Sequence, residues 1–420
     1  MKGLKTILLI LILLVAFDSV QAQQRFPKPE FKTGYTQPVP DTPLPHGVSR
    51  KFVDLTVLLT VMSLTAWFAI RKRWRRGILI LSVFSALYFG FLRQGCICPV
   101  GSIQNVVLAL ADPTYVIPLY VLLFFLLPLV FSLFFGRVFC GAACPLGAIQ
   151  DLLVFKPITI APWLRKTLGI FPYVYLGLAV LFAATGSEFI ICRYDPFIGI
   201  YRMHGPYLMI LLGIAFLLTG LFIARPYCRF ICPYGALLNI TSRFSRWHLS
   251  VYPAKSKCIE CKLCTTGCPF EAIDFPDVKE PRPEPRRNAR RFILFFILIP
   301  VIMAAGGWIG SKSHVFLSRA NQTVYVAELL ISHPELRDDP ANLDIQTFLA
   351  SGKSLETLVE EAQVIRHKFY VGSWILGVFL GLVIGLTALN QLIYRRKEDY
   401  QANKGACYSC GRCIDYCPVE

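Results

Sequence analysis

The chain has 420 residues, of which 55% are hydrophobic and only 16% charged, and its formal net charge is +17. This composition excludes an ordinary soluble enzyme and is typical of a protein that crosses a membrane several times. It also disfavours nucleic-acid binding, because the basic residues cluster beside apolar segments. One such cluster is RKRWRR at 71–76, and this is the positive-inside pattern of membrane proteins.

Residues 1–22 have the features of a secretory signal peptide, with a basic start, a short apolar run and a small-residue ending at Val20-Gln21-Ala22. An uncleaved anchor helix is the weaker alternative, because the apolar run from Thr6 to Phe17 is short for a membrane span. Residues 23–51 are rich in proline and lack apolar periodicity. We expect them to form an extended or disordered extracytosolic tail.

Seven apolar segments predict a mainly α, polytopic helical membrane protein of the bacterial inner (cytoplasmic) membrane. The first five form a core over 52–250, and the basic loop at 71–76 places the C-terminus in the cytoplasm. The polar loop at 310–369 is then exported, either as a docking surface for an extracytosolic partner or as a hairpin connector. The spans are 52–70, 77–93, 114–135, 168–186, 207–224, 292–309 and 370–393.

Two segments, 251–280 and 396–420, repeat the spacing C-x2-C-x2-C-x3-C followed by proline. This spacing is typical of bacterial ferredoxins with two [4Fe–4S] clusters, in which the fourth cysteine of each run binds the other cluster. Two complete runs disfavour a zinc site or disulfides. Two further spans at 281–395 separate the runs, so we expect a split ferredoxin lobe in the cytoplasm. The expected ligand sets are Cys258, Cys261, Cys264 and Cys417 for one cluster, and Cys407, Cys410, Cys413 and Cys268 for the other.

A second pattern repeats inside the membrane core, at CPVGSIQN (98–105), CPLGAIQD (144–151), CPYGALLN (232–239) and, in degenerate form, CRYDPFIG (192–199). The pattern indicates two parallel units, each running outward and back. The inner, cytoplasmic ends of the two units carry C-x3-C pairs. The two sulfurs of a pair would lie on one face of a helical turn, and the two pairs together could hold an iron–sulfur cluster or a single iron. Buried structural cysteines are the alternative. These residues are Cys140, Cys144, Cys228 and Cys232.

The outer ends of the two units carry only three cysteines, Cys96, Cys98 and Cys192. They form either a metal site whose fourth ligand comes from elsewhere or an exported disulfide. The sequence has no C-x-x-C-H haem motif, P-loop or dinucleotide fingerprint, and we assign no catalytic residue. The leading hypothesis is transmembrane electron transfer from quinol or a cytoplasmic donor to an extracytosolic acceptor. The alternatives are an accessory role in assembling, maturing or regulating a metalloenzyme, and a redox sensor.

Through these motifs, residues 52–420 resemble the membrane polyferredoxin family that includes NosR, NapH and the cytochrome-oxidase assembly ferredoxin. The resemblance implies an electron-transfer component that links the quinone pool or the cytoplasm to a periplasmic acceptor. NosR-like proteins carry a periplasmic flavin domain, whereas residues 23–51 are too few to fold around a flavin. A separate flavoprotein or reductase partner is therefore expected. The CxCP segment at Cys96 and Cys98 departs from the family's CxxxCP pattern.

Overall fold

The computed structural model describes residues 48–95, 99–251, 258–276, 285–338, 342–392 and 399–418. The predicted signal peptide and most of the predicted tail lie outside these residues. Each predicted span contains a helix. In the core these are α2 (Val48–Trp67) with the π-helix η1 (Phe68–Lys72), α3 (Arg75–Ser85) with η2 (Ala86–Leu92), α5 (Leu119–Phe135), α7 (Pro162–Leu168) with α8 (Phe171–Ala184), and α11 (Tyr207–Gly220).

Five helical stretches among the described residues are long and apolar enough to cross a membrane. The helices α5 and α11, with 17 and 14 residues, are shorter than the sequence predicts. A helix of 14 residues rises by about 21 Å, less than the ~30 Å thickness of a hydrocarbon core. The cysteine-bearing segments that follow α5 and α11 therefore begin before either helix could cross that thickness.

Among the short helices that were not predicted are α4 (Pro99–Ala111), α6 (Pro145–Leu153) and α13 (Pro233–Ser242). Each begins at the proline of a Cys-Pro repeat. Proline suits the first position of a helix, because an N–H there would have no acceptor within the helix and because the φ angle of proline is already helical. The helix α6 packs between α3 and α11, whereas α13 packs between α8 and α5. The helices α6 and α13 thus each contact the outward span of their own unit and the return span of the other, which interlocks the two units.

The last two spans form a hairpin of α15 (Pro285–Ser318) and α18 (Leu355–Leu392). Glycines four residues apart, Gly306 and Gly310 on α15 and Gly377 and Gly381 on α18, let the two backbones touch. A Cβ on Gly377 would lie 2.0 Å from the carbonyl oxygen of Gly306. The predicted exported loop is largely helical, with α16 (Gln322–Ser332), η5 (Pro334–Asp338) and α17 (Leu343–Ala350) around a small apolar core of their own.

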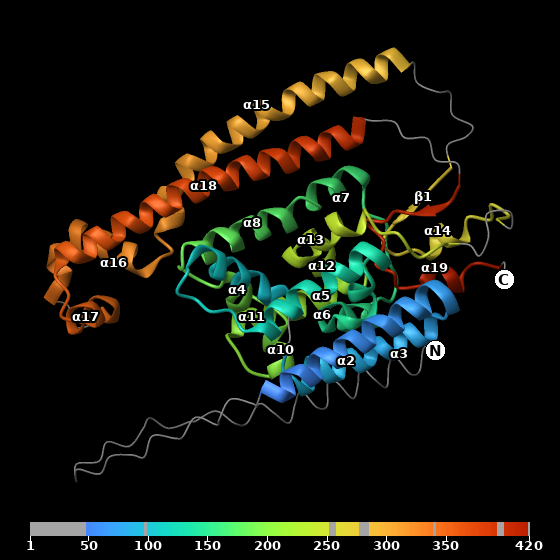
Figure 1. Ribbon diagram of the computed structural model, residues 1–420, viewed down its shortest axis with the longest axis horizontal. Helices are drawn as coiled ribbons and strands as arrows, with labels where there is room; N and C mark the ends of the chain where they lie inside the picture. The colour runs from blue at the N-terminus through green and yellow to red at the C-terminus, as the bar shows by residue number, and fades with distance from the viewer. Residues whose placement is uncertain are drawn as a thin grey trace, which may run out of the picture.

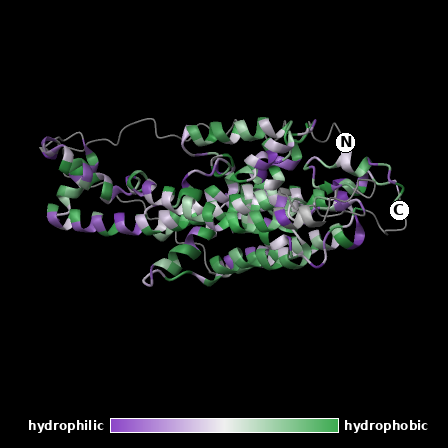
Figure 2. Cartoon of the chain, turned by 90° about the horizontal axis from the view of Figure 1, so that it is seen from above, coloured by the Kyte–Doolittle hydropathy of each residue, from purple (hydrophilic) through white to green (hydrophobic). Residues whose placement is uncertain are grey.

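The two ferredoxin halves meet although most of the chain's last third separates them. The strand β1 (Ile273–Asp274) pairs antiparallel with β2 (Gln401–Ala402), and α14 (Leu263–Gly267) packs against α19 (Arg412–Asp415). This lobe lies at one end of the long axis and the α16–α17 segment at the other (Figure 1). Figure 2 shows hydrophobic helices along the middle of the molecule and hydrophilic residues gathered towards both ends.

Candidate iron–sulfur sites

The structure sorts the ferredoxin cysteines into two small cavities. One cavity is lined by Cys258, Cys261, Cys264 and Cys417. The other is lined by Cys268, Cys407, Cys410 and Cys413. Each cavity therefore takes three sulfurs from one half of the lobe and one from the other, which is the crossed grouping expected from the spacing. The role of these eight residues as cluster ligands stays a prediction.

The two cavities differ in their exposure to solvent. Cys261 in the first cavity is exposed, whereas Cys407, Cys410 and Cys413 in the second are buried. Burial raises the pKa of Cys407 to about 12, because a thiolate is poorly solvated there. A bound metal is what would keep such a thiol deprotonated. None of the thirteen described cysteines forms a disulfide, and no three His, Cys, Asp or Glu side chains in the described ranges lie close enough to share a single ion.

The four inner cysteines are brought together in the core. Cys140 lies in the π-helix η3 (Phe139–Ala143) and Cys228 in α12 (Pro226–Phe230). Cys144 and Cys232 are the N-caps of α6 and α13. The two cysteines of a pair thus belong to consecutive short helices, not to one helical face as predicted. All four are buried and belong to the same cluster of packed core residues.

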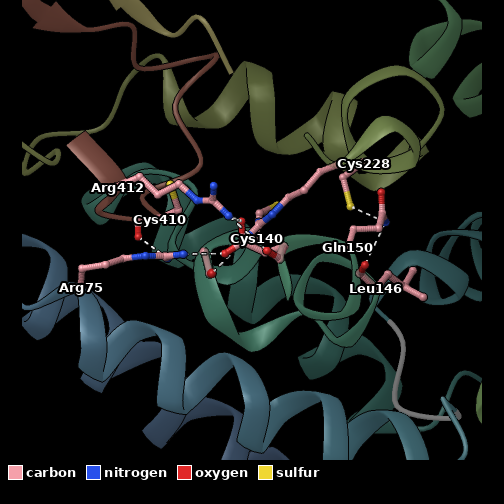
Figure 3. A network of polar contacts seen from close by, with 10 residues as sticks. Arg75, Cys140, Leu146, Gln150, Cys228, Cys410 and Arg412 are labelled. Atoms are coloured by element: carbon pink, nitrogen blue, oxygen red, sulfur yellow. Dashed lines mark hydrogen bonds and ion pairs between the residues drawn. The ribbon is translucent and has the colours of Figure 1, made fainter. Parts of the chain in front are cut away.

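A buried glutamine orients the inner sulfurs (Figure 3). The side-chain amide of Gln150 donates to the Sγ atom of Cys228 at 3.4 Å and to the carbonyl of Leu146 at 2.8 Å. Its oxygen accepts from the backbone N–H of Tyr227 at 3.2 Å. Hydrogen bonds to sulfur favour the thiolate and help set the reduction potential of a bound cluster. Gln150 therefore links the sulfur of Cys228 to the backbone on both sides of the site.

Arginines surround the inner cysteines. Arg225 donates to the carbonyls of Cys140 and Gly141, and its guanidinium lies 3.5 Å from the carboxylate of Asp151. Asp151 also pairs with Arg75 at 2.9 Å and Arg412 at 3.2 Å. Burial alone would raise the pKa of the Asp151 carboxyl. The three guanidiniums, of which Arg225 has the largest effect, instead hold that pKa well below its usual range. Three buried or half-buried cations thus share one carboxylate.

A further cation, Arg137, is buried among backbone carbonyls and an aromatic ring. It donates to the carbonyls of Gly405 and Gly235, each at 3.1 Å, and lies over the ring of Tyr408 at 4.3 Å. Among the described residues, the Nε atoms of Arg137 and Arg225 have no hydrogen-bond acceptor. Buried positive charge in such excess is costly unless an anion compensates it. The residues therefore fit an anionic iron–sulfur cluster bound by the four inner cysteines.

The ferredoxin lobe is docked directly on the inner cysteine loops. Tyr408 lies between two cysteines of the second cavity, and its hydroxyl donates to the carbonyl of Cys228 at 3.2 Å. A Cβ on Gly141, between Cys140 and Cys144, would lie 3.0 Å from the carbonyl oxygen of Tyr408. The ferredoxin lobe and the inner cysteine loops are therefore in direct contact.

The outer loop also reaches the inner one. The hydroxyl of Tyr201, on α10 (Ile198–Arg202), donates to the carbonyl of Pro145, the residue after Cys144, at 2.7 Å. The rings of Phe197 and Tyr227 are 5.2 Å apart. Cys192 lies in α9 (Ile190–Arg193), whereas Cys96 and Cys98 lie outside the described residues. The outer segment that carries Cys192 is thus folded into the core beside the inner cysteines.

Comparison with known proteins identifies the core. A 4Fe-4S binding domain family matches residues 117–170 and 205–252, which contain all four inner cysteines. This match is consistent with the NosR/NapH-like 4Fe-4S membrane protein family that the sequence resembles. An uncharacterized protein of Methanocaldococcus jannaschii, MJ0750, is 29% identical over 44% of this chain and 78% of its own length.

Two other relatives share shorter segments with this membrane polyferredoxin. NirI of Paracoccus denitrificans is 31% identical over 28% of the chain and 18% of its own length. YccM of Escherichia coli, whose name describes an electron transport protein, is 38% identical over 13% of the chain and 14% of its own length. The chain thus spans less than a fifth of either relative. No solved structure matches it.

Several site residues were not predicted, although the polyferredoxin sequence contains their signal. Arg137 and Arg225 each lie three residues before the first cysteine of an inner pair, as R-x-x-C-x3-C-P. Each guanidinium reaches across to the other unit, because Arg137 lies near Gly235 and Arg225 near Gly147. The arginine is therefore part of the repeat, and a search for residues shared by the two units would have found it.

Proposed function

We propose that this polyferredoxin transfers electrons across the membrane along a row of iron–sulfur sites. The row runs from the cavity of Cys258, through the cavity of Cys407, to the four inner cysteines and then to the outer cysteines Cys96, Cys98 and Cys192. A bound iron–sulfur cluster supplies one-electron chemistry. Two contacts support the proposal: the hydroxyl of Tyr408 donates to the carbonyl of Cys228, and that of Tyr201 donates to the carbonyl of Pro145.

Each group of residues has a part in this function. The eight lobe cysteines would hold two [4Fe–4S] clusters, and the inner four a third iron–sulfur centre. Arg137 and Arg225 offset the negative charge that such centres add inside the protein. The apolar core excludes water from the inner cysteines, which strengthens the interaction between these charges.

The orientation and the partners are part of the proposal. The basic segment at 71–76 lies at the ferredoxin end, since Arg73 donates to the carbonyl of Ser250 and Arg75 to that of Cys410. The positive-inside rule then supports a cytoplasmic lobe in a bacterial inner membrane. Quinol or a cytoplasmic reductant would be the donor, and an exported flavoprotein or reductase the acceptor. Supplying electrons for the maturation of a metalloenzyme would use the same row and differ only in the acceptor.

The test uses the purified full chain in liposomes, with dithionite outside and a membrane-impermeant dye inside as the acceptor. Vesicles with the wild-type chain should reduce the dye, whereas the double variant Cys144→Ala/Cys232→Ala should not, while both lobe clusters keep their EPR signals. Thr219→Ala is the matched control, because its exposed hydroxyl bonds only a carbonyl within α11. Normal dye reduction by the double variant would exclude the inner cysteines from the route.

A further inference from the structure

The outer loop that carries Cys192 repeats the construction of the inner site. In the inner site, the oxygen of Gln150 accepts from the backbone N–H of the residue before Cys228. In the outer loop, Gln104 occupies the same place in its own repeat, six residues after the Cys of Cys-Pro. Its oxygen accepts from the N–H of Ile191, the residue before Cys192, at 3.1 Å. Cys192 is therefore held against Gln104 as Cys228 is held against Gln150.

An aspartate precedes the proline where the inner segment has its second cysteine, although the outer segment is one residue shorter between its cysteine and that position. The inner segment reads CRFICPYG from Cys228, and the outer one reads CRYDPFIG from Cys192. Asp195 precedes Pro196 as Cys232 precedes Pro233. Its Oδ1 atom accepts from the N–H groups of Phe197 and Ile198 at 2.8 and 3.3 Å, much as the Sγ atom of Cys232 accepts from that of Gly235. Both bonds hold the Asp195 carboxyl in place through its Oδ1 atom, and neither of them involves its Oδ2 atom.

The segment beside Cys192 also contains a buried hydrogen-bond donor without an acceptor. Gln104 is 0% exposed, and its Nε2 atom has no hydrogen-bond acceptor among the described residues. The equivalent atom of Gln150 donates to a cysteine sulfur. The Sγ atom of Cys192 packs closely against Gly101, because a Cβ at that position would lie only 3.1 Å from it.

The electrostatics of the outer end suit an anionic centre. A cavity of about 650 Å³ lies beside Cys192. Its lining has one carboxylate, Asp54, and four cations, namely Arg50, Lys51, Arg93 and Arg202. Asp195 is not among the residues that line this cavity; it is only 4% exposed, and a buried carboxylate requires partners. A thiolate and a carboxylate are both ligands that bind iron.

We propose that Cys192 and Asp195 are ligands of an outer iron–sulfur site, in which an aspartate replaces the second cysteine of the inner pair. The proposal deepens the electron route proposed above, since it defines the centre at its exported end. Iron binding can nevertheless be measured without turnover. An oxygen ligand on one iron makes that iron distinguishable from irons bound only by sulfur.

The experiment compares full-length variants purified without oxygen, by iron content, EPR and 57Fe Mössbauer spectroscopy. Asp195→Ala and Cys192→Ala should each lose the iron of one cluster, and both variants should lose the same cluster. The EPR signals of the ferredoxin lobe should stay unchanged. Asp195→Cys should keep that iron and lose the signature of the oxygen-bound site. Asp112→Ala is the control, because Asp112 also precedes a proline at the outer end but only bonds Thr114 in an exposed turn.

Asp195→Asn guards against a folding artefact, because its amide oxygen can still accept from Phe197 and keep the start of α10 in place. Loss of the same iron in this variant supports ligation. Unchanged iron and spectra in Asp195→Asn and Asp195→Ala, or a wild-type protein without an oxygen-bound iron, would overturn the proposal. If the iron pattern holds but dye reduction in liposomes is absent, the site stands and the electron route fails.

Discussion

If the four inner cysteines hold a cluster as proposed, the positive charge of Arg225 should raise its reduction potential, and removal of that charge gives a quantitative test. Arg225 is fully buried and donates to the carbonyls of Cys140 and Gly141. At a separation of about 6 Å and an effective dielectric constant of ~20, one charge contributes roughly 3 kcal/mol. That energy corresponds to a shift on the order of 100 mV for a one-electron couple. Arg225→Met should therefore lower the potential by about this amount.

The assay is an EPR-monitored redox titration of the purified chain. Methionine nearly matches the volume of arginine, and Asp151 keeps Arg75 and Arg412 as partners, so the fold should survive. Arg225→Lys is the matched control, because it keeps the charge and should shift the potential far less. A change below roughly 20 mV in Arg225→Met, with the cluster still bound, would refute the reasoning that a charge at this distance acts through a poorly screened interior.

Three further changes test the packing around this site. Asp151→Asn leaves three guanidiniums without a carboxylate and should destabilise the folded chain by about 3–5 kcal/mol, seen as a lower unfolding midpoint; an unchanged midpoint would contradict the charge argument. Tyr201→Phe removes the bond to the Pro145 carbonyl and should cost about 1–3 kcal/mol by the same measurement. Gly377→Val should disrupt the α15–α18 hairpin and lower the yield of folded protein, whereas Ile375→Val on the exposed side of α18 should not.

The positions of the spans and the meeting of the two ferredoxin halves could be predicted because their signals are local. An apolar run of fixed length predicts a span, and the C-x2-C-x2-C-x3-C spacing already specifies a partner segment through its fourth cysteine. The grouping of Cys268 with Cys407, and of Cys417 with Cys258, follows from that spacing rule alone.

The charge network could not be predicted, because it depends on contacts between distant segments. Arg75 belongs to a basic loop that reads as a solvated cytoplasmic cluster, yet it is buried between Asp151 and Cys410. The short helices α6 and α13 were also missed, since their Cys-Pro starts read equally well as turns. Only the packing of each helix against the other unit decides between the two interpretations.

The crossed cysteine sets impose an order on biogenesis. Residues 258–268 leave the ribosome long before residues 407–417, and the helical hairpin α15–α18 is made in the interval. Neither cavity has its fourth sulfur until the second half arrives. Complete sets of four sulfurs therefore form only after the hairpin has been synthesised. A nascent chain that stalls within that hairpin would present only three of the four sulfurs in one cavity and a single sulfur in the other.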